Sequence, residues 1–242
     1  MSYKQKYYPE SRFGGFSDLD GTIIFYTRVN SLIMPEMVVL DIGCGRGKCS
    51  EDKISYRKNL QTFRGKCKKV IGLDIDADAR QNPYIDEFLL INGEKWPLLD
   101  GSIDLAICDA VLEHIPDPDI FFGECKRVIK NGGYLCIRTP NKFSYFGLIS
   151  HFIPNKYHSR VLKIAQPERK EVDVFPAYYK INTIRGLRAY LNKYGFDHCV
   201  YGYEEEPSYL SFSKIAYWFG VLHQKFSPKM IKVGIFAFGK KL

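Results

Sequence analysis

The sequence has no long apolar run. No stretch of this 242-residue chain reaches the roughly 18 consecutive apolar residues that a membrane-spanning helix requires. The opening residues, Met-Ser-Tyr-Lys-Gln-Lys, also lack the apolar core of a secretion signal. These absences argue against an integral membrane protein and predict a cytoplasmic location, while peripheral contact with a membrane stays open.

Paired cysteines are also absent. The chain has 7 cysteines, and none of them form the Cys-x-x-Cys pair that is typical of structural zinc sites. We therefore expect no metal. Single cysteines scattered through apolar stretches are typical of a reducing compartment. Internal repeats and low-complexity tracts are missing as well, which argues against a solenoid or a disordered chain.

The composition favours one folded domain, and the charge is distributed unevenly along the chain. Hydrophobic residues make up 45% of the chain and aromatic residues 15%, enough for a large core. The formal charge is −1 over residues 1–138, +7 over residues 139–193 and +2 over residues 194–242. The basic segment is either a solvated face or a surface that receives an anionic substrate or an anionic membrane.

Strand and helix patterns alternate along the chain. Apolar runs predict strands over 37–41, 69–74, 87–91, 103–109, 134–139, 198–203 and 230–239, and periodicity predicts helices over 20–32, 119–130 and 183–194. Asn131-Gly132-Gly133 is expected to end the second of these helices. The segment Tyr209–Phe226 is apolar on nearly all sides, so we expect it to pack within the protein rather than to lie on a membrane. Such alternation predicts a parallel sheet with helices on both faces.

The most informative stretch is Met37–Gly47, which reads Met-Val-Val-Leu-Asp-Ile-Gly-Cys-Gly-Arg-Gly. An apolar strand ends in Asp41, and glycines follow at alternate positions. Because glycine has no Cβ, backbone amides in such a turn can approach a small ligand closely. The dinucleotide fingerprint Gly-x-Gly-x-x-Gly does not fit, since Lys48 stands at its last glycine position. An ordinary tight turn is the alternative.

Polar side chains end five of the predicted strands: Asp41, Asp74, Asn92, Asp109 and Thr139. Ligands of doubly wound sheets bind at the carboxyl ends of the strands. Asp74 is placed to accept hydrogen bonds from both hydroxyls of a ribose, and the amide of Asn92 could accept from an adenine amino group. For Asp41 and Asp74, capping of the following turns is the alternative.

The chain resembles the class I S-adenosylmethionine-dependent methyltransferases over about residues 37–140. The resemblance rests on the acid-x-Gly-x-Gly-x-Gly motif and on the run from Asn92 to His114, with Trp96-Pro97, Asp100-Gly101-Ser102 and Leu112-Glu113-His114. It implies an α/β, Rossmann-like fold with a seven-stranded, mostly parallel sheet, an antiparallel last strand, and S-adenosylmethionine as cofactor. The implied cofactor-binding residues are Asp41, Gly43, Cys44, Gly45, Asp74, Ile75, Asn92, Gly93 and Asp109. The family often has Asp where Asn92 stands.

The charged groups of S-adenosylmethionine match the residues of this motif. Its carboxylate would use the amides and positive dipole end of a helix after Gly47, and its ammonium would use acceptors such as Asp41. We expect a single methyltransferase domain over 1–242. It divides into an N-terminal cap (1–36), a cofactor-binding core (37–140), and a substrate-side insert with closing strands (141–242).

The acceptor is predicted to be an anionic small molecule or a lipid-linked glycan, steered by basic residues of the insert: Arg160, Lys163, Arg169 and Lys170. His114 is a candidate base or orienting residue, with a local structural role as the alternative. Arg138 could pair with an anionic group or face solvent. His158, Tyr178 and Tyr179 are candidates for lining the acceptor pocket.

Three other functions fit parts of the sequence. The same fold could bind the cofactor without catalysis, as a regulatory module. The basic excess suggests a nucleic-acid methyltransferase, but no nucleic-acid-binding module accompanies it, so nucleic acid ranks below a small acceptor. Asp18-Leu19-Asp20-Gly21-Thr22 matches the nucleophile loop of haloacid-dehalogenase-type phosphatases. That loop must follow a buried strand, and Ser11–Ser17 does not resemble one, so helix capping is the preferred interpretation.

Overall fold

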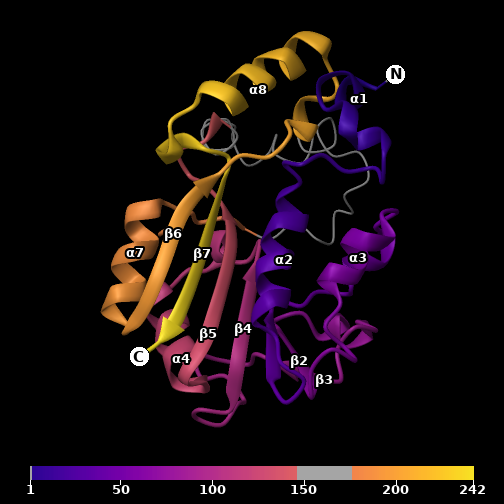
Figure 1. Ribbon diagram of the computed structural model, residues 1–242. Helices are drawn as coiled ribbons and strands as arrows, with labels where there is room; N and C mark the ends of the chain where they lie inside the picture. Colours follow the sequence, from indigo (N-terminus) through magenta and orange to yellow (C-terminus); the bar gives the residue numbers. More distant parts are fainter. Residues whose placement is uncertain (1, 146–175) are drawn as a thin grey trace.

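A computed structural model of the chain describes residues 2–145 and 176–242 (Figure 1). Its strands are β1 (Val38–Ile42), β2 (Lys69–Asp74), β3 (Glu87–Leu90), β4 (Ile103–Asp109), β5 (Ile129–Pro140), β6 (Phe196–Tyr203) and β7 (Gly234–Lys241). Its α-helices are α1 (Tyr3–Tyr7), α2 (Gly21–Leu32), α3 (Ser55–Gln61), α4 (Pro118–Val128), α7 (Ile184–Lys193) and α8 (Lys214–Phe226). Short 3₁₀ turns include η2 (Lys48–Glu51), η3 (Ala77–Gln81), η4 (Leu112–His114), η6 (Ser208–Leu210) and η7 (Lys229–Ile231).

The strands form one seven-stranded sheet in the order β3-β2-β1-β4-β5-β7-β6. The pairs β3–β2, β2–β1, β1–β4 and β4–β5 are parallel, and β7 is antiparallel to both of its neighbours. The mostly parallel sheet with an antiparallel last strand is therefore confirmed. The chain crosses over between β3 and β4, so the carboxyl ends of β1 and β4 lie side by side in the middle of the sheet.

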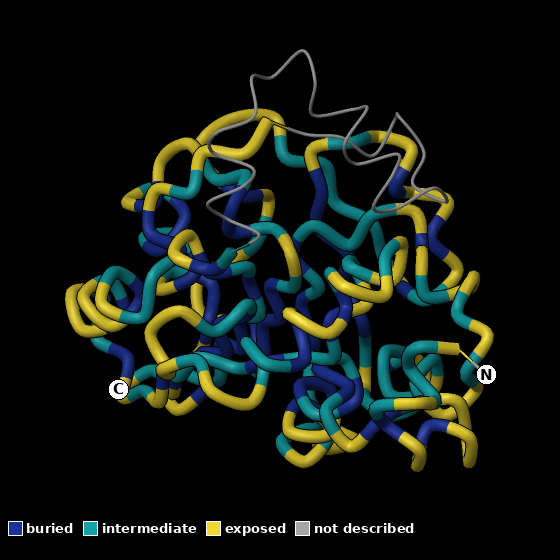
Figure 2. Tube along the Cα trace, turned by 90° about the horizontal axis from the view of Figure 1, so that it is seen from above, coloured by how far each residue is buried: buried dark blue, intermediate teal, exposed yellow. Residues whose placement is uncertain are grey.

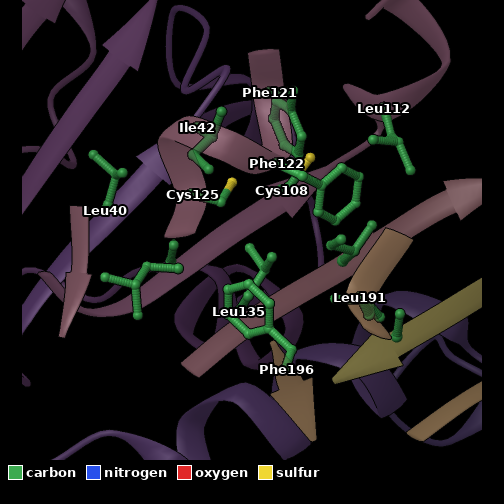
Figure 3. Packing of buried hydrophobic residues seen from close by; sticks show 14 of the residues in the cluster. Leu40, Ile42, Cys108, Leu112, Phe121, Phe122, Cys125, Leu135, Leu191 and Phe196 are labelled. Carbon is green, nitrogen blue, oxygen red and sulfur yellow. The ribbon is translucent and has the colours of Figure 1, made fainter. Parts of the chain in front are cut away.

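Helices cover both faces of the sheet, as predicted. On one face, α4 and α7 bury Phe122, Cys125 and Leu191 against the strands (Figure 3). On the other face, α2 buries Phe25 and Val29. Together these two layers enclose the central strands, which are apolar on both sides because both sides are covered.

Local sequence explains where the helices begin. Asp20 accepts a hydrogen bond from the Ile23 N–H and so caps α2, and Asp117 caps α4 directly before a proline at its first position. Thr183 caps α7 in the same way. A coil and turn, not a strand, precede Asp20, so the structure supports the capping interpretation of the Asp18–Thr22 stretch.

The expected boundary between the helix over 119–130 and the strand over 134–139 is wrong. Helix α4 ends at Val128, and Asn131-Gly132-Gly133 lies inside β5 instead of ending the helix. Ile129 already pairs with Ile103 of β4, and Tyr134 pairs with Leu105. The four residues between Ile129 and Tyr134 bulge out of the ladder, where the positive φ of Gly132 suits the bend.

The carboxyl ends of the parallel strands form the upper edge of the sheet in Figure 1, and α8 and α1 lie above this edge. Seen from that side, buried segments occupy the middle of the molecule (Figure 2). Within residues 2–145 and 176–242, no helix is long and apolar enough to cross a membrane.

Candidate active site

The turn after β1 depends on glycine at each alternate position. Gly43, Gly45 and Gly47 have φ values of 67°, 52° and 79°. A Cβ on Gly43 would lie 2.3 Å from a Val111 methyl carbon, and one on Gly47 would lie 2.9 Å from the Asn82 side chain. A Cβ on Gly45 would meet nothing within 4 Å. The first and third glycines therefore serve packing, whereas Gly45 faces open space at the strand ends.

Asp74 joins this turn to the end of β2. One oxygen of its buried carboxylate accepts the Gly45 N–H at 2.8 Å, and the other accepts the Asp76 N–H at 2.9 Å. Asp74 thus caps the turn that follows it, as the capping interpretation expects. Each carboxylate oxygen can accept a further hydrogen bond, so ribose hydroxyls can still be bound there.

Asp41 lies half-buried at the end of β1, and within the described residues no hydrogen bond to its carboxylate is present. Burial, followed by the nearby carboxylates of Asp109 and Asp74, raises the pKa of Asp41 to about 7. An unpartnered carboxylate between two others favours a cationic ligand and disfavours the pyrophosphate of a dinucleotide.

The expected helix after Gly47 is wrong. Only the four-residue 3₁₀ turn η2 follows it, and α3 begins eight residues after Gly47, at Ser55. The turn is fixed instead by side chains: the Asn82 amide donates to the Cys44 carbonyl at 2.9 Å, and Arg46 pairs with Asp76 at 2.7 Å. The turn therefore offers no helix dipole to a ligand carboxylate, and the N–H groups of Gly43, Cys44 and Gly45 already donate to the Leu73 carbonyl and to Asp74. Burial raises the pKa of the Cys44 thiol, which keeps it neutral.

The remaining predicted residues at the ends of β2 and β3 are accessible. Ile75, Asn92 and Gly93 are all exposed, and the Ile91 N–H donates to the Asp74 carbonyl at 2.8 Å, which holds the two strand ends together. An exposed isoleucine beside an exposed amide provides an apolar surface and a hydrogen-bonding edge, which suits a planar base.

Asp109 has a different environment from Asp41 and Asp74. The Arg138 guanidinium donates to both of its oxygens at 2.6 and 2.7 Å, and the Tyr26 hydroxyl donates to one of them at 2.8 Å. Arg138 also donates to the Thr22 hydroxyl at 2.8 Å. Arg138 is therefore paired inside the protein and does not face solvent. Through these bonds the Asp109 carboxylate links β4 to β5 and to α2. We call this group of linked side chains the wall of the site.

Three residues of this wall were not predicted from the sequence: Thr22, Tyr26 and Glu205. Thr22 and Tyr26 are four residues apart on α2 and so lie on the same helical face. Glu205 packs on Gly21, where a Cβ would lie 2.1 Å from its carboxylate oxygen. Burial raises the pKa of Glu205, and the Arg138 charge opposes that shift. The spacing of Thr22 and Tyr26 was the only sequence signal for the pair.

A second cluster of hydrogen-bonded polar side chains lies at the end of β5. The Asn182 amide donates to the Thr139 hydroxyl at 2.6 Å, and that hydroxyl donates to the Glu113 carboxylate at 3.1 Å. Burial raises the pKa of Glu113. The Nδ1 of His114 lies 2.8 Å from the Pro176 carbonyl, which can only accept, so this nitrogen carries the proton. His114 thus has a structural partner, and its role as a base stays a prediction.

Much of the basic insert lies outside the described residues, including His158, Arg160, Lys163, Arg169 and Lys170. Of the predicted acceptor-pocket residues, Tyr178 and Tyr179 are described. Their N–H groups donate to the Glu113 carbonyl at 2.7 and 3.2 Å. Tyr179 has a positive φ of 49°, a strained value for a residue with a Cβ.

Asp20 has a structural role. Besides capping α2, its carboxylate accepts from Arg57 at 2.7 Å, and Arg57 also pairs with Asp52. Across the described part of the chain, no group of three His, Cys, Asp or Glu side chains is gathered as a metal site would require.

Comparison with known families agrees with the strand order and the glycine turn. A family model described as a methyltransferase domain matches residues 40–137, which run from β1 into β5. This match supports a class I S-adenosylmethionine-dependent methyltransferase. Within the matched region, Asp41, Asp74 and Asp109 lie at the ends of three adjacent strands, in the sheet order β2-β1-β4.

Similar proteins agree with this assignment. A probable S-adenosylmethionine-dependent methyltransferase of Mycolicibacterium smegmatis is 33% identical over 53% of this chain and 47% of its own length. A ubiquinone biosynthesis O-methyltransferase of Photorhabdus laumondii is 28% identical over 43% of each chain. The matches thus span less than half of these relatives. An Archaeoglobus fulgidus methyltransferase structure shares the fold, with a TM-score of 0.55, 21% identity, and coverage of 96% of this chain and 97% of its own.

Proposed function

We propose that this methyltransferase binds S-adenosylmethionine at the ends of β1, β2 and β3 and transfers its methyl group to an anionic acceptor. The observation that carries the proposal is the unpartnered carboxylate of Asp41 beside Asp74, under a glycine turn whose middle glycine faces open space. The cofactor combines an ammonium, a sulfonium and a ribose diol, and these groups suit carboxylate acceptors.

The protein's part in such a reaction is mainly positioning. Bound S-adenosylmethionine supplies an electrophilic methyl group and a thioether as leaving group. Asp41 would hold its ammonium, Asp74 its ribose hydroxyls, and Ile75 with Asn92 its base. The Asp109–Arg138 pair and Tyr26 form a fixed wall on the β4 side, which supports an acceptor held in line and away from water.

An anionic acceptor is supported by charge. Residues 139–193 carry +7, and this segment follows β5 directly. The acceptor class we propose is a phosphate-linked or carboxylated small molecule, or a lipid-linked glycan. All seven cysteines are free thiols, which supports a reducing compartment.

A matched pair of glycines tests the cofactor site. Gly45 and Gly101 have φ values of 52° and 56°, and a Cβ on either would meet nothing within 4 Å. Gly101 precedes β4, at the opposite edge of the sheet. The backbone strain from alanine, about 1–2 kcal/mol, should therefore be the same at both positions.

Calorimetry with S-adenosylhomocysteine should show one site. Gly45→Ala should weaken that binding at least tenfold, whereas Gly101→Ala should leave it unchanged at an equal loss of Tm. Asp74→Ala should weaken it by about 1–3 kcal/mol. Asp86 accepts the Val70 N–H at the other end of β2, so Asp86→Ala should lower only stability.

Binding of NAD without binding of S-adenosylhomocysteine would overturn the cofactor assignment. Cofactor binding without methyl transfer to any anionic acceptor would favour the regulatory module.

A further inference from the structure

Helix α8 has two apolar faces with different surroundings. One face carries Tyr217, Gly220 and Val221, which are buried. Tyr217 and Val221 pack with Tyr8, and a Cβ on Gly220 would lie 2.4 Å from Pro207. This face explains why the segment looked like a core element in the sequence.

The opposite face is exposed, so the expectation that the whole segment packs within the protein is wrong. Ile215, Trp218, Phe219 and Phe226 are 70%, 44%, 59% and 79% exposed, and half-buried Leu222 lies between them. We call these five residues the α8 stripe. Their spacing of i, i+3, i+4, i+7 and i+11 places them within one arc of about 100° on the helix. The Trp218 and Phe219 rings touch edge to face, with centroids 4.9 Å apart.

The turns on either side of α8 extend the apolar surface. Phe212 precedes the helix, Met230 and Ile231 lie in η7 after it, and all three are exposed. So many exposed apolar side chains on one helix and its flanking turns are uncommon on a monomer unless something binds there. Two aromatic rings and aliphatic side chains on one helix face are typical of interfacial helices.

The charged residues of α8 and of the chain that follows it have one sign. No Asp or Glu occurs from Pro207 to Leu242, a segment that contains six lysines. Lys214 and Lys225 are exposed, and helix geometry puts both along the same border of the stripe. Exposed Lys229 follows in η7. A partner for this surface must therefore combine an apolar layer with negative charge.

The helix also has a suitable place in the molecule. It lies above the carboxyl edge of the sheet, next to α1 and on the same side as the candidate active site (Figure 1). Exposed Lys6 of α1 adds a further positive charge there. A flat partner bound at the stripe would thus face the edge at which ligands enter.

We infer that the α8 stripe docks on the surface of an anionic lipid bilayer, with the helix lying in the plane of the interface and its lysines among the headgroups. A bilayer provides the apolar layer and the negative charge together. A second copy of the chain fits less well, because an antiparallel two-fold contact through the stripe would bring Lys214 of one copy against Lys225 of the other. The inference does not depend on methyl transfer, since docking needs no cofactor.

Vesicle flotation tests the inference with the full chain and no cofactor. The protein should float with vesicles of phosphatidylcholine and phosphatidylglycerol, and bind vesicles of phosphatidylcholine alone at least tenfold more weakly. The chain has two tryptophans, and Trp96 is buried while Trp218 is exposed. Tryptophan emission should therefore shift to the blue on docking, and the shift should disappear in Trp218→Phe.

The decisive variant removes the apolar groups and keeps every charge. Trp218→Ser/Phe219→Ser should reduce partition into anionic vesicles at least tenfold. Leu99→Ser/Leu242→Ser, at residues 80% and 78% exposed elsewhere on the surface, should not change it. Lys225→Glu/Lys229→Glu should abolish the preference for anionic vesicles, and Lys68→Glu/Lys126→Glu should not.

Two results would overturn the inference. Unchanged vesicle binding by Trp218→Ser/Phe219→Ser would show that net charge alone causes the binding. Absence of vesicle binding, together with a concentration-dependent dimer that the same variant abolishes in sedimentation, would assign the stripe to a second copy. Equal Tm values of the variants and the wild type exclude misfolding as the reason for either result.

Discussion

At the scale of single residues, Asp41 is the most informative side chain of the site. Burial and the Asp109 and Asp74 carboxylates raise its pKa to about 7. Near neutral pH, the protein without ligand therefore holds this carboxyl partly protonated. A ligand ammonium would favour the ionised form, so binding should release a proton.

The first prediction concerns pH. S-adenosylhomocysteine affinity should fall as pH drops from 7 to 5, by about tenfold per unit at most, because the carboxyl must then lose a proton to bind. Calorimetry in two buffers of different ionisation enthalpy measures both the affinity and the released proton. Asp41→Asn should bind more weakly at pH 7.5 and show a flat profile. Wild-type affinity that stays constant from pH 5 to 7 would contradict a role for Asp41.

The same substitution has a consequence for stability, with a defined sign. The unfolded carboxyl ionises near pH 4 and the folded one near pH 7, so Asp41 costs folding free energy that grows between these values. In the absence of ligand, Asp41→Asn should match the wild-type Tm at pH 3.5. It should exceed the wild-type Tm by a margin that widens up to pH 7 and is constant above it.

Sequence reasoning placed Asp41 and Asp74 together because each ends a buried strand, and the ends of adjacent parallel strands meet. It did not find Tyr26 or Glu205. Tyr26 lies 83 residues from Asp109 along the chain, and no short-range pattern reports a contact over that separation. Conversely, Arg138 looked available for an anion because the sequence does not show that its partner stands on the neighbouring strand.

At the scale of elements, the Asp109–Arg138 pair joins β4 to β5 and, through Thr22 and Tyr26, both strands to α2. The two side chains are only 15% and 19% exposed. Removing one partner of such a pair leaves the other charge poorly solvated.

The second prediction follows from this pair. Arg138→Met should lower the free energy of unfolding by about 3 kcal/mol, measured by urea denaturation. Arg64 forms a more exposed pair with Asp86, so Arg64→Met should cost under about 1 kcal/mol. The double variant Arg138→Met/Asp109→Leu should regain part of the loss. Equal costs for the two arginines would mean that the pair at β4 and β5 is not a structural link.

Most element types and the parallel pairing of the sheet were predictable, since periodicity and strand–helix alternation are local signals. The antiparallel last strand came from the family resemblance, and the order of the strands was not predicted. The errors occur where tertiary contacts decide. Only the 3₁₀ turn η2 follows Gly47, and Arg46 and Asn82 fix that turn by contacts to residues far along the chain. Likewise, β5 extends back to Ile129 because Ile103 of β4 pairs with it, which no helix-ending signal could indicate.

At the scale of the whole molecule, the excess positive charge lies outside residues 1–138, which include the candidate cofactor site. Residues 1–138 are close to neutral, and the excess lies in the segment after β5 and in the last 36 residues. Clustered charge raises the encounter rate with an ion of opposite sign, and salt weakens this effect as the screening length falls to about 10 Å at 0.1 M.

The third prediction uses that salt dependence. Arg160→Glu/Lys163→Glu should lower kcat/KM for a phosphate-linked acceptor about tenfold at low salt and flatten its salt dependence. Affinity for S-adenosylhomocysteine should not change. Lys68→Glu/Lys126→Glu makes the same change in net charge outside the basic segment and should affect neither quantity. Turnover indifferent to both salt and charge reversal would mean that the basic segment is only a solvated face.

The contacts after β5 also affect how the length of the following segment can change in evolution. The Lys142 N–H donates to the Asn182 carbonyl at 2.8 Å, and the Asn182 amide donates to Thr139, so two points far apart in the sequence are joined beside the end of β5. The free energy of closing a loop changes by only about 0.6 kcal/mol for each doubling of its length. The connection between Lys142 and Asn182 can therefore change in length at a small cost in free energy, while the sheet and the glycine turn stay as they are. Under the proposed function, a change in this connection would alter the acceptor that is bound without changing the glycine turn.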